Sequence, residues 1–365
     1  MKIIHAADLH LDSPFAFLGD PLKKKQRKAE LLKAFDDMVS YGAENGVSAI
    51  IIAGDLFDKG KVSADTRNTV VSSIEQHPQI AFFYLRGNHD RSDLFGPGDS
   101  LPANLYTFGT MWTYYNLGSR ITLCGAELGR ENALSATSDL VLDSSRFNIV
   151  VLHGQTAATG SADGAELINV NAFRNKGIDY MALGHVHSFK LDRIDSRGTY
   201  CYPGCLEARG FDETGAHGFV LLDIDETGRT CRAQLISTPI RTCRTVDVDI
   251  SGTMTTAEAL DVINAKLEEL HIPERDLVEL RLTGNVDVAG ECDEVFAESR
   301  LQGRFYYLKV RKCVEIKVDY EAYELEQSLK GEFVRTVRAC EDLSDEDKAA
   351  IIKMGIDALR KGEVE

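Results

Sequence analysis

Paired cysteines, long uncharged runs and positive charge are all scarce in this 365-residue sequence. Its eight cysteines include no CxxC pair, which indicates reduced thiols in a cytoplasmic protein and excludes a disulfide framework. The apolar N-terminal run meets Asp8 and His10 too early for a signal peptide, and residues 101–119 contain Pro102 and Asn104, so we expect no membrane partner. The net charge of −16 argues against a generally basic nucleic-acid binder, although it leaves room for a local basic patch.

Short apolar runs alternate with helical or loop segments over the first 240 residues. A helical stripe of Leu31, Phe35 and Met38 lies within residues 22–45, and Asn45-Gly46 predicts its end. Runs that are apolar at every position are typical of strands buried on both faces. The sequence therefore predicts a layered α/β domain over residues 1–240. The expected strands are residues 3–7, 49–53, 80–85, 121–124, 148–152 and 180–183.

The pattern changes after residue 240, where we expect a small α+β domain over residues 241–325. Thr255 and Glu258 form a capping box, followed by a helical stripe, with strands expected at residues 277–282 and 306–318. Residues 326–365 predict a charged helical segment with Ser344 as a helix cap. An apolar stripe there, Ile352, Ile356 and Leu359, either docks on a partner or packs on the chain itself.

Residues with metal-binding side chains follow five of the expected strands. They are Asp8-Leu9-His10, Gly54-Asp55-Leu56-Phe57-Asp58, Gly87-Asn88-His89-Asp90, His153-Gly154 and Gly184-His185-Val186-His187. Because ligands gather at the carboxyl ends of strands in α/β sheets, these five segments are expected to meet. Asp8 and His10 are two residues apart, as are His185 and His187, and in extended backbone both members of such a pair point to the same side. The glycines precede ligands where the backbone turns sharply or approaches another group closely.

The types of candidate ligand limit which metals the site would bind. Imidazole, carboxylate and amide ligands suit manganese, iron, zinc, cobalt or nickel rather than calcium. Seven candidates are too many for one ion, and two ions that share a bridging carboxylate account for them. The seven are Asp8, His10, Asp55, Asn88, His153, His185 and His187.

Taken together, the motifs DxH, GDxxD, GNHD, HG and GHxH resemble those of the calcineurin-like metallophosphoesterase superfamily, and within it the SbcD and YhaO-type DNA repair exonucleases. The resemblance covers about the first two-thirds of the chain and implies a metallophosphoesterase β-sandwich flanked by helices, followed by a capping domain. It also implies roles. Asp8, His10, Asp55 and His187 would hold one metal, and Asp55, Asn88, His153 and His185 the other; His89 would lie beside the scissile phosphate and Asp90 would orient it.

Three features have two interpretations each. Asp90 either orients His89 or caps a turn, and Asp58 either braces the loop after Asp55 or takes part in catalysis. A basic cluster either contacts the phosphates of DNA or forms a solvated helix face. That cluster is Lys23, Lys24, Lys25, Arg27 and Lys28.

The first hypothesis is a two-metal phosphodiesterase acting on DNA, an exonuclease of DNA repair with Mn²⁺ as the expected metal. The alternatives are a metallophosphoesterase for a small substrate, such as a cyclic nucleotide or a nucleotide sugar lipid, and a non-catalytic scaffold. The segment from Gly54 to Lys61 fails the Walker A pattern, so any ATP dependence must come from elsewhere. The resemblance implies an SMC-like coiled-coil ATPase as a partner, and a homodimer is an open alternative.

Overall fold

The protein is described by a computed structural model that covers residues 1–59, 62–90, 95, 101–129, 132, 135–156, 167–225, 230–288, 290, 292–318 and 320–362. The chain forms two compact units, Met1–Thr242 and Cys243–Glu365. The further division expected at residue 325 stays a prediction, and residues 363–365 of that segment lie outside the described part. Among the described helices, none has the length and apolar character needed to cross a membrane.

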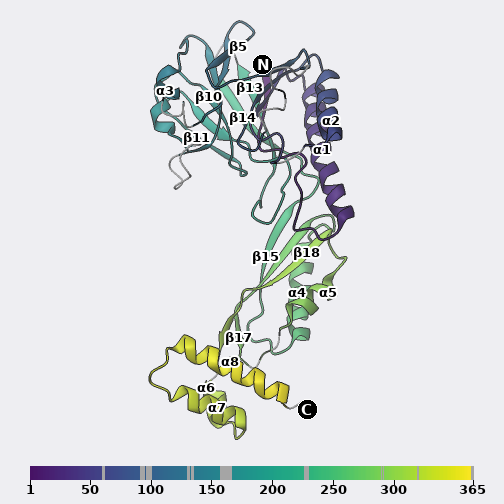
Figure 1. Cartoon of the computed structure of the whole chain (residues 1–365), viewed down its shortest axis with the longest axis vertical. Coiled ribbons are helices and arrows are strands. Elements are labelled where there is room, and N and C mark those ends of the chain that lie inside the picture. The colour runs from purple at the N-terminus through teal and green to yellow at the C-terminus, as the bar shows by residue number, and fades with distance from the viewer. Residues whose placement is uncertain are drawn as a thin grey trace. The chain divides into compact units, whose positions relative to one another are not determined.

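Two six-stranded sheets form the centre of the first unit (Figure 1). The first has the order β14 (Thr230–Ser237), β13 (Gly218–Asp225), β1 (Lys2–Ala6), β2 (Ala49–Ala53), β3 (Ala81–Leu85) and β4 (Leu105–Thr107). The second has the order β11 (Lys190–Arg193), β12 (Thr199–Tyr202), β10 (Tyr180–Gly184), β7 (Phe147–His153), β6 (Ile121–Gly125) and β5 (Thr113–Leu117). The inner strands pair in parallel, so their carboxyl ends share one edge of each sheet.

The main core lies between these sheets. Ile3 and Ile51 of the first sheet belong to one buried cluster with Ile149 and Val151 of the second. Side chains alternate along each strand, so Ile4 is also fully buried, on the opposite face. Each such side chain stabilises the fold by about 1.5–3 kcal/mol when it is fully buried. The runs that are apolar at every position are therefore strands buried on both faces, and the layered α/β prediction is confirmed.

Helices cover the first sheet. The helices α1 (Pro21–Glu44) and α2 (Ala64–Glu75) lie side by side (Figure 1). Asp20 caps α1 by accepting a hydrogen bond from the Leu22 backbone N–H, and Pro21 occupies its first turn. The stripe of Leu31, Phe35 and Met38 is buried as predicted. The remaining elements of this unit are β8 (Gln155–Thr156), β9 (Leu167–Ile168), α3 (Ala136–Asp139) and a 3₁₀ turn (Val170–Phe173).

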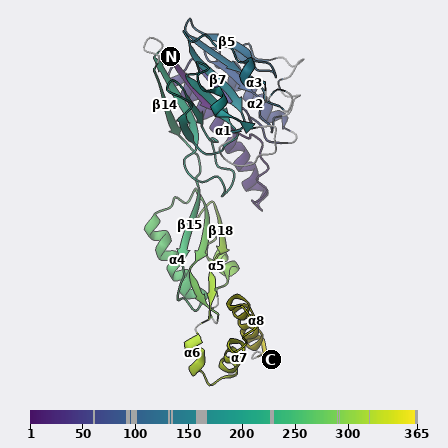
Figure 2. The ribbon, with the colours of Figure 1, turned by 90° about the vertical axis from the view of Figure 1, so that its left-hand side faces the viewer.

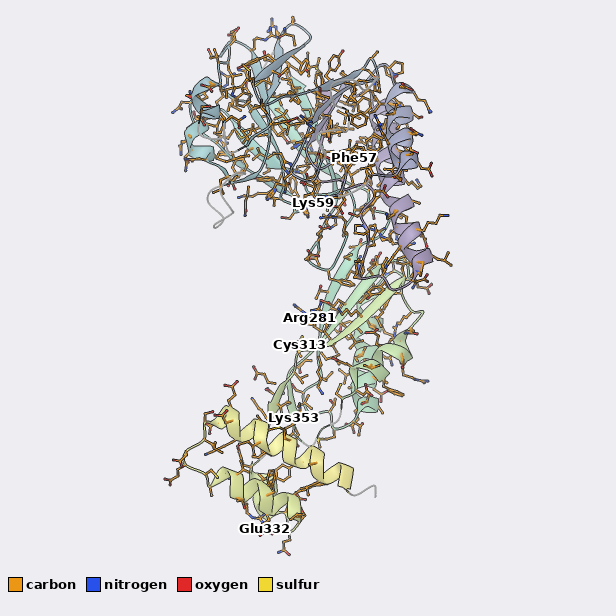
Figure 3. All side chains as sticks on the ribbon, in the orientation of Figure 1. Phe57, Lys59, Arg281, Cys313, Glu332 and Lys353 are labelled. Carbon is orange, nitrogen blue, oxygen red and sulfur yellow. The ribbon has the colours of Figure 1, made fainter. Side chains whose placement is uncertain are left out.

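The second unit has a three-stranded parallel sheet of β15 (Cys243–Asp249), β16 (Leu277–Thr283) and β18 (Tyr307–Lys312). The helices α4 (Thr256–Leu270) and α5 (Glu294–Leu301) lie against it (Figure 2). The predicted capping box of Thr255 and Glu258 opens α4. The single strand expected over residues 306–318 is two strands, β18 and β19 (Glu315–Lys317), and β19 pairs with β17 (Asn285–Asp287). Arg281 of β16, labelled in Figure 3, forms an ion pair with Asp247 of β15 at 2.7 Å.

Three helices end the chain: α6 (Tyr320–Leu325), α7 (Leu329–Arg338) and α8 (Asp345–Gly362). Ser344 caps α8 by accepting a hydrogen bond from the Asp347 N–H at 3.1 Å, as predicted. Ile352 and Ile356 are fully buried in a cluster with Val334 of α7, so the stripe packs on the chain itself. The interpretation in which these two side chains dock on a partner is therefore wrong.

Candidate active site

Backbone pairing continues beyond the strand ends and joins four of the five segments in two pairs, one pair on each sheet. The Asp8 N–H donates to Gly54 O at 3.0 Å, and the His10 N–H donates to Asp55 O at 2.9 Å. On the second sheet, the Gly154 N–H donates to Gly184 O at 3.1 Å. The loops after neighbouring strands are thus joined, as expected for ligands at the carboxyl ends of an α/β sheet.

The local backbone differs from the extended geometry that the i, i+2 spacing predicted. Asp8, His10, Asp55 and His185 all have positive φ, with values of 54°, 45°, 52° and 103°. Residues other than glycine cost about 1–3 kcal/mol each in such sparsely populated regions, so surrounding contacts must hold them there. Four of the seven candidate ligands therefore lie in strained backbone, which is common at functional sites.

Two glycines allow the close approach that the sequence predicted. A Cβ on Gly54 would lie 2.1 Å from His153 Nδ1, and a Cβ on Gly87 would lie 2.2 Å from Asp55 Oδ1. Neither contact is sterically possible, so any side chain at these positions would displace a candidate ligand. The glycines before Asp55 and Asn88 are thus required by the packing of the site.

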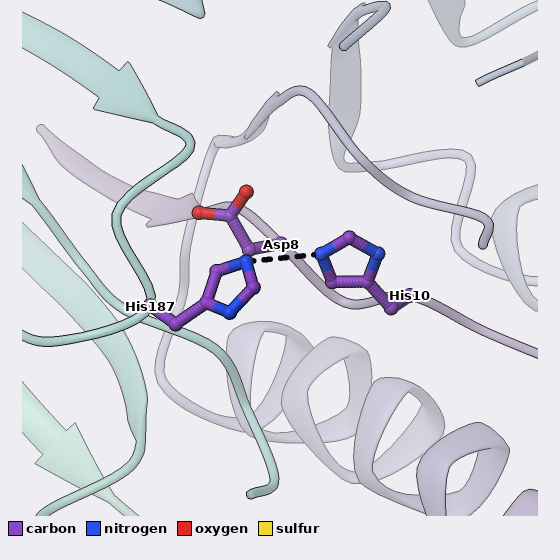
Figure 4. A group of neighbouring side chains, drawn as sticks. All are labelled: Asp8, His10 and His187. Atoms are coloured by element: carbon purple, nitrogen blue, oxygen red, sulfur yellow. Dashed lines mark hydrogen bonds between the residues drawn. The ribbon is translucent and has the colours of Figure 1, made fainter. Parts of the chain in front are cut away.

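The first group of candidate ligands is Asp8, His10 and His187, which offer ligand atoms within 4.8 Å of one another (Figure 4). His10 Nε2 and His187 Nε2 are 3.2 Å apart. The Asp8 carboxylate is fully buried and accepts from the His185 backbone N–H at 2.9 Å through either oxygen. Two imidazole nitrogens and a fixed carboxylate converge here, a donor set that suits a divalent transition metal.

The second group is Asp8, Asp55 and His153, again within 4.8 Å. His153 Nδ1 lies 2.9 Å from Ala53 O, so Nδ1 carries the proton and Nε2 faces the site. There, His153 Nε2 lies 3.1 Å from Asn88 Oδ1. In this tautomer both atoms present lone pairs, which fits a shared cation.

Asp55 joins the two groups. Its Oδ2 lies 3.7 Å from His10 Nε2 and 3.5 Å from His153 Nε2, while its Oδ1 accepts from the His89 N–H at 2.8 Å. This is the placement expected of a bridging carboxylate. The ring of His185 lies 5.4 Å from that of His153, centroid to centroid, so contacts connect all seven candidates. Their role as ligands stays a prediction.

His89 is held by Asp58. His89 Nδ1 lies 2.9 Å from Asp58 Oδ1, and the other oxygen of Asp58 accepts from Ser13 Oγ at 2.6 Å. Burial would raise the pKa of Asp58, but the facing imidazoles of His10, 3.7 Å away, and His89 outweigh burial and hold that pKa well below the usual range. The Nδ1–H of His89 is thereby fixed, and Nε2 remains as the atom that can exchange a proton with a substrate.

Asp90 caps the neighbouring loops. Its carboxylate accepts from the backbone N–H groups of Gly87 and Phe57, both at 2.9 Å, and of Leu56 at 3.3 Å. Burial raises the pKa of Asp90 to about 6. The implied role of Asp90 in orienting His89 is therefore wrong, because Asp58 makes that contact and Asp90 binds backbone.

The sequence profile described as "Calcineurin-like phosphoesterase" matches residues 1–189, about half of the chain. The chain belongs to this family. It is thus a metallophosphoesterase, a hydrolase of a family that binds two divalent metals, and the site described above contains groups of residues that could hold metal ions.

Relatives of this phosphoesterase include two curated proteins of low identity. An uncharacterized metallophosphoesterase YhaO of Bacillus subtilis is 27% identical over 236 residues, which cover 61% of this chain and 57% of that protein. A DNA double-strand break repair protein Mre11 of Methanopyrus kandleri is 24% identical over 256 residues, covering 62% and 55%. The match thus spans about half the length of these relatives. The solved structure of TT1561 of Thermus thermophilus has a TM-score of 0.39 at 13% identity, covering 64% of this chain and 98% of that one.

In the metal-free phosphoesterase site, one candidate ligand, His153, has a pKa above neutral. Burial lowers the pKa of His153, but its hydrogen bond to Asp55 and the charge of Asp8 outweigh burial and raise that pKa to about 9. Burial would also raise the pKa of Asp55, yet the same contact lowers it to about 2. Burial raises the pKa of Asp8 to about 6 and lowers that of His10 to about 4. A divalent cation must therefore compete with protons.

Sequence reasoning missed two residues of this site, Arg209 and Glu213. Glu213 Oε1 lies 2.7 Å from His187 Nδ1, and Arg209 donates to the same oxygen at 2.7 Å. Both lie in a long connection between β12 and β13 that has no periodic pattern. The spacing of four between them was the available signal, and it did not point to His187.

The basic cluster on α1 divides in two. Arg27 is fully buried, so its expected contact with DNA is wrong; it pairs with Glu30 at 2.6 Å and Glu207 at 3.2 Å. Arg241 forms a further ion pair with Glu30, at 2.7 Å. Lys28 forms an ion pair with Asp12, in the loop after β1, at 3.0 Å. Of the cluster, Lys23 and Lys24 are half-buried and Lys25 is exposed.

Proposed function

We propose that this protein is a two-metal-dependent DNA phosphodiesterase, an exonuclease, that uses Mn²⁺. The observation that carries the phosphodiesterase proposal is the Asp55 carboxylate, whose Oδ2 lies 3.7 Å from His10 Nε2 and 3.5 Å from His153 Nε2. One carboxylate shared between two histidine groups supports a pair of ions about 3.5–4 Å apart, the arrangement for in-line displacement at phosphorus.

The roles of the side chains follow from their contacts. When bound, two ions would neutralise charge on the phosphate oxygens. Asp8, Asp55 and the facing imidazoles would hold them. His89 Nε2 donates a proton to the leaving oxygen, while the 2.9 Å contact of its Nδ1 with Asp58 stabilises the charged ring. A pocket of about 200 Å³, lined by Asn88 and His153 among others, gives a phosphate access to this edge of the site.

DNA as the substrate is supported by the relatives rather than by the geometry. Relatives of 24–27% identity include DNA double-strand break repair proteins named Mre11, and each is matched over 50–64% of its own length. The second unit after Thr242 also favours a polymer over a small substrate, because a small phosphate ester does not need a further domain.

The test is a side-by-side hydrolysis assay with Mn²⁺ on linear DNA, circular DNA and cyclic nucleotides. We expect mononucleotide release from linear DNA and none from covalently closed circles. Faster turnover of cyclic nucleotides would favour the small-substrate alternative. Fewer than two bound ions per chain and no turnover of any ester would favour a scaffold. His89→Ala is the control, since it removes a proton donor and leaves the candidate ligands in place.

We further propose that the C-terminal helices contact an SMC-like coiled-coil ATPase. Because Ile352 and Ile356 are buried, the contact would use exposed apolar side chains such as Leu329 of α7 and Met354 of α8. Leu329→Asp with Met354→Asp should abolish co-purification with such an ATPase encoded nearby. Met111→Asp in the first unit is the matched control, since Met111 is also a largely exposed apolar side chain. Retained binding in the double variant would refute the proposal.

A further inference from the structure

Glu213 is the centre of a buried hydrogen-bond network beside His187. Its Oε1 lies 2.7 Å from His187 Nδ1, and its Oε2 accepts from the Arg209 backbone N–H at 2.7 Å. The ring of His217, which is 1% exposed, donates from Nε2 to the Glu213 backbone carbonyl at 3.0 Å. The carboxylate therefore has little freedom to move, and it faces His187 from the side opposite His10.

Because Arg209 also reaches His187, the presence of Glu213 decides which ring nitrogen of His187 carries the proton. Its terminal nitrogen NH2 lies 2.7 Å from Glu213 Oε1 and also 3.1 Å from His187 Nδ1. A guanidinium can only donate hydrogen bonds. With Glu213 present, the carboxylate accepts from both neighbours, so His187 carries its proton on Nδ1. Without Glu213, the guanidinium would donate to Nδ1 instead and leave the ring proton on Nε2.

The two forms of His187 differ in what they can bind. With the proton on Nδ1, Nε2 offers a lone pair toward His10 Nε2, 3.2 Å away (Figure 4). With the proton on Nε2, the ring cannot serve as a ligand at that position. A carboxylate behind a ligating histidine is the usual means of fixing the tautomer and the ring orientation.

The same arginine also reaches the group behind His89. Arg209 NH1 lies 3.9 Å from Asp58 Oδ2, and Asp58 holds His89 Nδ1. One side chain, only 18% exposed, thus lies between the carboxylate behind a candidate metal ligand and the carboxylate behind the candidate proton donor.

We propose that Glu213 and Arg209 are a positioning pair. Glu213 selects the tautomer of His187 that can bind a metal, and Arg209 holds the carboxylates of Glu213 and Asp58 in position. This inference rests on the proposed function in taking His187 as a metal ligand. It predicts that the effect of Arg209 on metal affinity depends on Glu213. Arg209 raises the affinity when Glu213 is present and lowers it when Glu213 is absent.

The test is Mn²⁺ titration of the full-length protein by calorimetry, with Glu213→Ala, Arg209→Ala and the double variant. We expect Glu213→Ala to raise the Kd about 10–100-fold, the range found when such an outer carboxylate is removed. The double variant should bind more tightly than Glu213→Ala alone, because the competing donor is gone. Glu213→Gln keeps an acceptor oxygen and should stay within a fewfold of the wild type.

A second measurement reads the tautomer directly. In ¹⁵N spectra of histidine-labelled, metal-free protein at a pH where the ring is neutral, His187 should shift from Nδ1–H to Nε2–H in Glu213→Ala. In the double variant the ring should exchange between both forms, because neither partner remains at Nδ1. Arg197→Ala is the matched control: Arg197 pairs with Asp179 at 2.6 Å near the start of β10, and its loss should leave both readouts unchanged.

The outcomes separate this inference from the proposed function. A wild-type protein that binds no Mn²⁺ refutes the function. Normal wild-type binding with an unchanged His187 tautomer in Glu213→Ala refutes the positioning pair. A double variant that binds more weakly than Glu213→Ala also refutes it, since that result would mean a purely structural brace.

Discussion

Replacement of Asp58 by asparagine tests how much the charge of Asp58 contributes to the proposed role of His89. The variant keeps the size of the side chain and an oxygen for Ser13 Oγ, which lies 2.6 Å away, but it removes the charge 2.9 Å from His89 Nδ1. A hydrogen bond to a charged group contributes about 1.5–3 kcal/mol. If Asp58 stabilises the protonated, proton-donating form of His89 by this amount, its loss should lower kcat by up to roughly 10–150-fold, at about 1.36 kcal/mol per factor of ten.

The assay compares kcat for a chromogenic phosphodiester among Asp58→Asn, His89→Ala and the double variant, with bound metal quantified in each. His89→Ala should lower kcat by about 10²–10⁴-fold with both ions retained. The double variant should match His89→Ala, because Asp58 acts through that ring. Additive losses would refute the reasoning, as would metal loss in His89→Ala. Asp90→Asn is the contrast: it removes backbone contacts and should lower thermal stability more than kcat.

Four further predictions concern metal, protons and charge. Asp55→Asn should lose both ions, and two tightly bound metals by elemental analysis would contradict the bridging role. Mn²⁺ binding near pH 7 should release protons, because the pKa of His153 is about 9 in the metal-free site. Calorimetry in two buffers measures this release, and the affinity for Mn²⁺ should rise with pH up to about 9. Lys24→Gln with Lys25→Gln should flatten the log–log salt dependence of DNA binding by about 0.9 per contact. Arg27→Ala should instead destabilise the fold by about 3–5 kcal/mol in denaturant titrations, since it strands Glu207.

Much of the first unit could be predicted from periodicity. The strands that lead to the candidate ligands, β1, β2, β3, β7 and β10, are apolar at nearly every position, and burial on both faces requires that pattern. The edge strands β11 and β14 were not predicted. Their side chains are half exposed, so they carry only a weak alternation that loops also show.

The site was predictable to the extent that its residues follow strands. Residue types and spacing placed Asp8, Asp55 and His153 together, because strand ends share an edge of the sheet. Spacing could not show that Arg27 is buried, since its partner Glu207 is 180 residues away in sequence. It likewise could not assign His89 to Asp58 rather than Asp90, because that choice depends on the paths of the loops after β2 and β3.

The buried ion pairs around Arg27 fix the point at which the polypeptide leaves the first unit. Arg241, directly before the final residue of that unit, pairs with Glu30 on α1, and Glu207 accepts from the backbone N–H of Ile240. A mechanical pull on the chain beyond Thr242 would thus be resisted by a salt-linked anchor on a 24-residue helix rather than by the edge strand β14. The segment that carries Glu207 continues to Arg209, so tension at this exit acts within a few residues of the arginine that contacts His187.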